Sequence, residues 1–570
     1  MAPIMDMPSR GLTGDRHDHC HHHHHAYGTM KDASQPNSES AGKRGMSSPS
    51  SPSSSTALGI FVLVSLTFTT VISSAIVCLS LAVPRLGELG AHQNILLYVS
   101  YSMSSASGLT SFIVETWNHR KAMVCGLILV NAYVVCFWLA TCMDIDDDSD
   151  IDASQHGVVW VVIHAGACVG GIGSSIAWTA QGSYFSDLST TFVQRNFIDQ
   201  LDSATSKLGG IFATIYLIVE AMMDVSSSIM LQYTTVSWNS MFALYATLSL
   251  SATAINAIVL IRMMDDNDDG NEDDDSCQPQ LRLPAQQDNQ PHQRRIRDRV
   301  KNKCTKTLDV TWKEPKMWQV TGFTAAFGLS SAYINSVVSG GILPLVWNDD
   351  RSKVVGAFAA GHAILSALTS HLQMVITQSS PSMLPSSSAR SDFAEVHQHR
   401  HQHRPRCRPF TTKRAMLVVG CCSCCLVGLV FFALPQTTWN RSWTIAIYIL
   451  HGISRGTFEG TLKAWIAEHL TDVKEAAFSS LVLVSGMTTA LGYLVASGFI
   501  CSSGIGGATP ITATADEEWM MIANDKIGQC VEYASDGSFH SVWMLQLLVI
   551  GAGVCGAMQM LLGHGVRFHQ

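Results

Sequence analysis

Residues 57–83 read ALGIFVLVSLTFTTVISSAIVCLSLAV, a run without a single charged side chain. A helix needs about 20 apolar residues to cross a hydrocarbon core about 30 Å thick. The run exceeds that length, and it does not alternate between apolar and polar residues as the strands of a membrane β-barrel do. It therefore predicts a transmembrane α-helix.

The same pattern recurs along the 570-residue chain, which is 47% apolar and only 14% charged, a composition typical of a protein surrounded mainly by lipid. The runs predict an all-α membrane protein with twelve transmembrane helices and the lipid bilayer as its first partner. They lie approximately at residues 57–83, 94–116, 122–143, 157–180, 206–224, 238–262, 318–340, 354–376, 415–435, 443–466, 477–501 and 541–563.

The positions of Lys and Arg predict the orientation, because cytosolic loops are enriched in these residues. With the N-terminus in the cytosol, interior segments hold 29 of the 36 Lys and Arg, exterior loops hold five, and two lie inside a span. An even number of spans places both termini on the same side. We therefore expect both termini to be cytosolic. The plasma membrane and internal membranes both fit this pattern.

The spans divide six and six around a polar linker that begins acidic and ends basic. Fragments repeat in corresponding spans: Ile72–Ala75 (ISSA) matches Leu329–Ala332 (LSSA), and small residues recur at four-residue steps in spans four and ten. These repeats predict two pseudo-symmetric six-helix bundles. The expected parts are a disordered cytosolic tail at 1–55, a bundle at 56–264, the linker at 265–317, a bundle at 318–563 with a His/Arg-rich cytosolic loop at 377–414, and a tail at 564–570.

The exterior loops carry two candidate modification sites. The chain's one N-x-S/T sequon is Asn440-Arg441-Ser442, in a loop predicted to face outward, so Asn440 is a candidate glycosylation site. Cys501 and Cys530 border the last exterior loop and could pair in an oxidising compartment. Most other cysteines lie within spans, where cysteine usually packs as a small apolar residue.

One motif at the end of span four is more specific. The chain reads Gly170-Gly-Ile-Gly173-Ser-Ser-Ile-Ala-Trp178-Thr-Ala-Gln181-Gly182-Ser-Tyr184, a glycine-rich helix followed by W-x-A-Q-G-x-Y. This segment resembles the uncoordinated-93-like family, a divergent branch of the major facilitator fold. The segment Glu475-Ala-Ala-Phe478 is similar to one that the family carries before span eleven. The resemblance implies either a regulator of ion channels or a chaperone that escorts receptors.

The loop after span two departs from ordinary major facilitators, which carry G-x-x-x-D-R-x-G-R-R there as a cytosolic latch. This chain has Glu115-Thr-Trp-Asn-His-Arg120-Lys121, which keeps the basic pair and loses both the glycine and the aspartate. The change argues against a standard transport cycle and for the regulator or chaperone.

Span ten carries the sharpest local signal, because His451, Arg455, Glu459 and Lys463 recur every four residues and form a stripe on one helix face. A charge in mid-bilayer costs about 2.5–3.5 kcal/mol on insertion scales, so Arg455 needs a partner or a wet cavity. Glu459 is the nearest candidate partner, and Lys463 lies close enough to the cytosolic end to snorkel.

The resemblance implies that spans one, four, seven and ten line a central cavity. A substrate or ion site would then combine Arg455 and Glu459 with Trp178, Gln181, Tyr333 and Asn335. The alternative is a structural ion pair that fixes helix packing. For the two other ionisable residues at depth, His164 in span four and Glu220 near an outer helix end, we expect structural roles.

Other patterns point away from catalysis and cofactors. The histidine tracts at 17–25 and 397–403, the acidic run at 265–276 and the cysteines at 421–425 are interpreted as low-complexity, solvated or packing segments, so we expect no metal site. The chain has no phosphate-binding glycine loop or nucleophile elbow, and we expect no enzyme activity, cofactor or nucleic-acid partner. Two functions remain: a regulator or chaperone bound to an ion channel or receptor, or a transporter of a small solute or ion.

Overall fold

The computed structural model describes residues 54–86, 88–143, 153–196, 201–233, 237–268, 305–347, 353–379, 412–434, 440–502 and 539–562. Within these residues every regular element is helical and there is no strand. The predicted tails, both histidine tracts and most of the linker and of the loop at 377–414 lie outside them.

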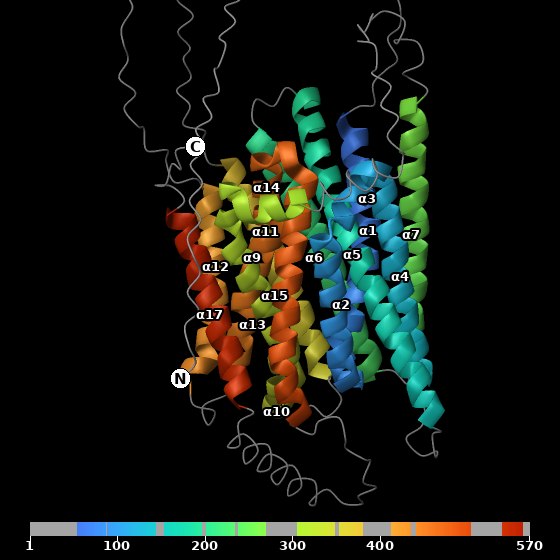
Figure 1. Cartoon of the computed structure of the whole chain (residues 1–570), viewed down its shortest axis with the longest axis vertical. Helices are drawn as coiled ribbons and strands as arrows, with labels where there is room; N and C mark the ends of the chain where they lie inside the picture. The colour runs from blue at the N-terminus through green and yellow to red at the C-terminus, as the bar shows by residue number, and fades with distance from the viewer. Residues whose placement is uncertain are drawn as a thin grey trace, which may run out of the picture. The chain divides into compact units, whose positions relative to one another are not determined.

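The described helices fall on all twelve predicted spans, which confirms the all-α fold (Figure 1). The first six spans are α1 (Ser54–Leu86), α2 (Glu88–Ala106) with α3 (Leu109–Trp117), α4 (His119–Met143), α5 (Ala153–Asn196), α6 (Leu201–Tyr233) and α7 (Trp238–Asp268). The second six are α9 (Pro315–Ala332) with η1 (Tyr333–Ile342) and α10 (Leu343–Trp347), α11 (Lys353–Ser379), α12 (Thr412–Ala433), α13 (Arg441–Gly456) with η3 (Thr457–Leu462) and α14 (Lys463–His469), α15 (Lys474–Ser502) and α17 (Phe539–Leu562), with the short turn η4 (Thr471–Val473) before α15.

Nine of the described helices are long and apolar enough to cross a membrane without interruption. The other three predicted spans are broken. Gly108, with a left-handed φ of 67°, separates α2 from α3, and the π-helical segments η1 and η3 interrupt spans seven and ten. A π-helical turn holds more residues than an α-turn, so it changes which side chains face a neighbour. The sequence predicted continuous helices at these three places and missed the breaks.

Two helix pairs join the two bundles. Span two packs against span eleven through α2 and α15, and span five packs against span eight through α6 and α11 (Figure 1). The pseudo-symmetry that relates the halves exchanges these two pairs. Small residues allow the close approach: a Cβ on Gly486 would lie 2.5 Å from the Tyr101 ring, and one on Gly210 would lie 2.6 Å from Met374.

The glycine steps that the sequence singled out also lie at helix contacts. A Cβ on Gly170 would lie 2.5 Å from Tyr133 of α4, and a Cβ on Gly456 would lie 2.4 Å from the Ser366 carbonyl of α11. Such distances are below any normal carbon contact. These small residues therefore let the helix backbones approach closely.

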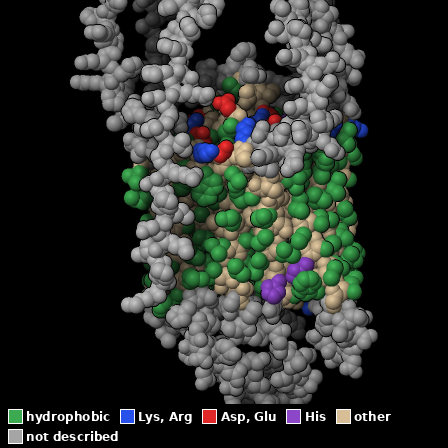
Figure 2. Space-filling model, in the orientation of Figure 1, with side chains coloured by type: hydrophobic (Ala, Val, Ile, Leu, Met, Phe, Trp, Pro, Cys, Tyr) green, Lys and Arg blue, Asp and Glu red, His purple; other side chains and the backbone are tan. Residues whose placement is uncertain are grey.

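The visible surface agrees with a membrane-spanning body. Figure 2 shows hydrophobic side chains in a broad band, with Lys, Arg, Asp and Glu gathered beyond its upper edge, the end at which Figure 1 places α3 and α14. The predicted orientation makes this the cytosolic end.

Candidate functional site

A cavity of about 200 Å³ lies between the two bundles. Its wall is built by helices of both halves: α1, α2, α5 and α6 from the first, and α9, η1, α11, α13, η3, α14 and α15 from the second. Spans one, four, seven and ten all contribute, as the resemblance implied. The described lining residues include four that carry a formal charge: Glu220, Arg455, Glu459 and Lys463.

Arg455 of α13 pairs with Glu220 of α6, not with Glu459. Its Nη1 donates to Glu220 Oε1 at 2.6 Å and its Nη2 to Glu220 Oε2, while Nη2 also donates to the Tyr216 hydroxyl at 3.1 Å. Both side chains are largely buried, at 12% and 3% exposed. This two-pronged ion pair therefore joins the two bundles at the cavity wall.

The expected partnership of Arg455 with Glu459 is wrong for a physical reason. The π-helical segment η3 begins at Thr457, between the two residues, and alters the stepping of the helix face. The structural role expected for Glu220 rested on its position near an outer helix end. That position is wrong, because α6 continues to Tyr233 and places Glu220 well inside the helix.

Glu459 pairs instead with Lys463, one turn further along the span. The Lys463 ammonium lies 3.6 Å from the centroid of the Trp178 ring and 5.8 Å from that of Phe212. The Lys463 side chain is only 10% exposed, so the expectation that it snorkels to the cytosolic end is wrong. The aromatic faces and the carboxylate compensate the burial of this cation.

Two histidines extend the Arg455 network. Arg455 Nη1 lies 3.5 Å from His362 Nδ1, and His362 Nε2 lies 2.8 Å from His451 Nδ1. Because a guanidinium can only donate, His362 Nδ1 accepts, so in the neutral ring Nε2 carries the proton and donates to His451. His451 Nε2 then faces the Ser331 hydroxyl at 3.4 Å.

The structure brings most of the predicted site residues together. Trp178, Gln181 and Asn335 line the cavity with Arg455 and Glu459. Tyr333 is the exception. It lies two residues before Asn335, so the two side chains point to nearly opposite sides of the helix, and only Asn335 lines the cavity. Tyr333 is fully buried, and its hydroxyl accepts a hydrogen bond of 2.9 Å from Gln546 of α17.

The remaining residues of the W-x-A-Q-G-x-Y segment serve packing. A Cβ on Gly182 would lie 2.4 Å from the Phe478 ring of α15, and one on Gly173 would lie 2.5 Å from Leu129 of α4. Tyr184 is buried at 4% exposed. The motif thus brings α5 close to α4 and to the other bundle, and it puts Trp178 and Gln181 on the cavity wall.

Sequence reasoning missed His362 and Tyr216 and misjudged Glu220. A histidine within the apolar run at 354–376 was the available signal for His362, since ionisable residues at depth usually mark a functional position. Tyr216 carried no signal, because a tyrosine in a helix is common in any membrane protein. The structural role expected for His164 fits its geometry, since its ring stacks on Trp160 at 4.0 Å between ring centroids.

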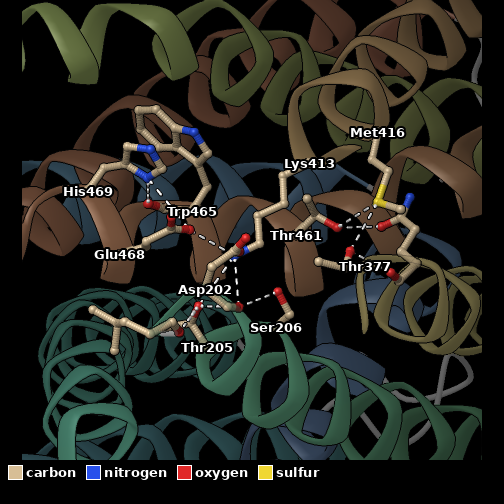
Figure 3. Close-up of polar contacts among 12 residues, drawn as sticks. Asp202, Thr205, Ser206, Thr377, Lys413, Met416, Thr461, Trp465, Glu468 and His469 are labelled. Atoms are coloured by element: carbon tan, nitrogen blue, oxygen red, sulfur yellow. Dashed lines mark hydrogen bonds and ion pairs between the residues drawn. The ribbon is translucent and has the colours of Figure 1, made fainter. Parts of the chain in front are cut away.

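Ion pairs also tie the two bundles together at the predicted cytosolic end of the molecule. Lys413 of α12, whose side chain is 5% exposed, forms an ion pair with the carboxylate of Asp202 in α6 and donates a hydrogen bond to Glu468 Oε2 of α14 at 2.8 Å (Figure 3). Lys474 of α15 pairs with Asp187 of α5. Each cluster contains groups from both halves.

The second cluster stands where the latch motif was judged to be lost. His119 Nδ1, at the start of α4, lies 3.5 Å from Asp187 Oδ2, so the start of α4, α5 and the start of α15 meet here. Asn118 takes a backbone conformation (φ 71°, ψ 143°) that usually requires glycine. His119, Asp187 and Lys474 therefore form a contact between the two halves beside the loop after span two.

Several predicted sites lie at the edge of the described residues. Asn440 is exposed at the start of α13, and its side chain accepts hydrogen bonds from the backbone of Ser442 and Trp443. Glycosylation there stays a prediction. Cys530 lies outside the described residues, so its disulfide with Cys501 also stays a prediction. Cys421 and Cys424 are buried among packed helices, and the described residues contain no group of three or more potential metal ligands.

Comparisons with known proteins agree with this architecture. The family model described as Major Facilitator Superfamily matches residues 58–497, while no curated protein matches the chain. Among solved structures, the chain is similar to the xylose transporter XylE from E. coli in a partially occluded inward open conformation, at 10% identity and a TM-score of 0.50, over 88% of this chain and 96% of that one.

It is also similar to a bacterial homologue of the iron transporter ferroportin in an outward-facing state, at 12% identity and a TM-score of 0.47, over 87% of this chain and 99% of that one. At 10% identity, the similarity to XylE supports the fold alone. None of these matches singles out the uncoordinated-93-like branch. The family match spans most of the chain, including eleven of the twelve predicted spans, and the chain belongs to the Major Facilitator Superfamily.

Proposed function

We propose that this protein is a transporter that moves a small polar solute or ion through the cavity between its two bundles. The observation that carries the proposal is the Arg455–Glu220 ion pair, which crosses from one bundle to the other inside the cavity. Binding a solute at this point would change the contacts between the halves. That is what a transporter needs if the bundles rock against each other around a fixed site.

The alternative function, a regulator or chaperone of another membrane protein, has less support. It rests on the W-x-A-Q-G-x-Y motif, and the residues of that motif lie in helix contacts or on the cavity wall rather than on an outward surface. The loss of the latch motif also weighs less, because Asp187 and Lys474 join the halves at that end. Both observations favour transport.

The test is flux. The purified full-length chain is reconstituted into liposomes, and the uptake of potassium, protons, xylose, glycine and acetate is measured under imposed gradients. We expect flux of at least one probe, and we expect it to be lost in the double variant Glu220→Leu/Arg455→Met. The control is Lys313→Gln, which removes an exposed ion pair with Asp309 outside the cavity.

Flux that survives the double variant would contradict the site assignment. A folded protein that moves none of the probes, and that co-purifies with a channel or receptor, would overturn the proposal in favour of the regulator.

A further inference from the structure

The Lys463 ammonium occupies a small compartment that has the features of a ligand site. Trp178 forms one wall, at 3.6 Å from the nitrogen, and Phe212 lies at 5.8 Å. The Phe68 ring packs against both, with its centroid 5.2 Å from that of Trp178 and 6.0 Å from that of Phe212. Glu459 supplies the anion. Aromatic faces combined with a carboxylate are how proteins bind ammonium groups of ligands.

We propose that this compartment recognises the ammonium group of a zwitterionic solute, and that the Lys463 ammonium occupies the same position while the cavity holds no solute. This inference rests on the proposed transport function and names the substrate class of the same cavity. The Lys463 side chain is a flexible stem of four methylene groups, so a change of rotamer can move its ammonium out of the compartment without movement of the backbone. Both Glu459 and Lys463 line the cavity, which makes them reachable by a solute.

The balance of charges at Glu459 and Lys463 determines which class of solute the compartment binds. When a zwitterion enters, its ammonium takes the place of Lys463 against Glu459 and Trp178, and its carboxylate binds the displaced Lys463 ammonium. Every charge keeps a partner. A solute with a single positive charge would leave Lys463 unpaired, and a solute with a single negative charge would leave Glu459 unpaired. Removing one partner of a buried ion pair is strongly unfavourable, so both kinds of singly charged solute bind less well.

The other ion pair of the cavity does not offer this exchange. Arg455 holds both oxygens of Glu220, and the Tyr216 hydroxyl adds a third contact. Its partners come from the opposite bundle, so separating them means separating the bundles. Glu459 and Lys463 lie on one span and can be parted by rotation of side chains alone. The solute is therefore received at Glu459 and Lys463.

Binding to the purified full-length chain in detergent micelles tests the inference by isothermal titration. The probes are three zwitterions of increasing charge separation, glycine, β-alanine and γ-aminobutyrate, with acetate, methylammonium and xylose as singly charged and neutral counterparts. We expect at least one zwitterion to bind, and to bind at least about tenfold more tightly than the counterparts, as hydrogen bonds to charged groups imply.

Lys463→Gln and Glu459→Gln should each weaken zwitterion binding about 10- to 100-fold. Because either change leaves a buried charge alone and could impair folding, the double variant Glu459→Gln/Lys463→Met removes both charges together. It should fold, as judged by its unfolding temperature, and should lose zwitterion binding. Lys313→Gln, at an exposed pair of the same i,i+4 spacing, is the matched control and should bind as the unmodified chain does.

Three outcomes overturn the inference: no zwitterion binds, the counterparts bind as tightly, or the double variant binds zwitterions unchanged. Flux separates this result from the transport proposal. Flux of xylose or acetate without zwitterion binding would leave transport standing and remove the substrate class. Zwitterion binding without flux of any probe would keep the ligand class and remove the transport proposal.

Discussion

Replacing Glu220 by glutamine removes the charge that neutralises Arg455. Both side chains are largely buried, so the guanidinium would remain in the protein interior with the Tyr216 hydroxyl, His362 Nδ1 and one amide oxygen as acceptors. Breaking a buried ion pair by removing one partner costs about 3–5 kcal/mol. Glutamine keeps one acceptor, so we expect the free energy of unfolding to fall by about 3 kcal/mol.

The double variant Glu220→Leu/Arg455→Met gives the matched comparison. Replacing a buried ion pair by apolar residues of similar volume is often neutral or stabilising, so its free energy of unfolding should lie within about 1 kcal/mol of the unmodified chain or above it. Unfolding is followed by tryptophan fluorescence as the mole fraction of sodium dodecyl sulfate rises in mixed micelles. If the single substitution costs less than about 1 kcal/mol, or the double variant is as unstable as the single one, the assignment of this pair is refuted. A stable double variant that still transports would make the pair structural.

Three local predictions test the fold around the site by the same unfolding measurement. Asn118→Gly should raise the free energy of unfolding by about 1 kcal/mol, since glycine adopts its backbone conformation without strain, whereas Asn118→Val should lower it. Gly182→Ala should lower the free energy of unfolding by about 1–3 kcal/mol, because the added methyl group collides with Phe478. The double variant Gly182→Ala/Phe478→Leu should recover part of that loss. If the single and the double variant are equally stable, the contact is contradicted. Asn440→Ala should lose the helix cap at a cost of about 0.5–2 kcal/mol, while Asn440→Asp keeps it; both should abolish the mobility shift that glycosidase treatment gives if Asn440 carries a glycan.

The sequence predicted the number and places of the spans, because the length of an apolar helix is imposed by the bilayer and can be counted. It also predicted that Arg455 needs a partner, since the cost of a charge in lipid does not depend on the fold. The sequence could not predict which residue is that partner. Glu220 lies 235 positions away, and only the packing of α6 against the second bundle brings it near.

The errors at the site have two local causes. The polar residues that follow Asp224 lowered the apparent hydropathy, so the predicted span ended at residue 224 and put Glu220 at a helix end, although α6 runs on to Tyr233. The π-helical segment η3 begins between Arg455 and Glu459 and changed which side chains of span ten face the same neighbour. No simple pattern of apolar residues announces a π-helical segment.

The pairing of the cavity charges has an electrical consequence. Among the described residues that line the cavity, two carry a positive and two a negative formal charge, so the wall is neutral as a whole. Each elementary charge that crosses 100 mV exchanges about 2.3 kcal/mol with the membrane potential. A cycle that carries a net-neutral solute past a neutral wall exchanges almost none. The voltage across the membrane would then neither drive nor oppose it, and the direction of movement would follow the concentration gradient of the solute.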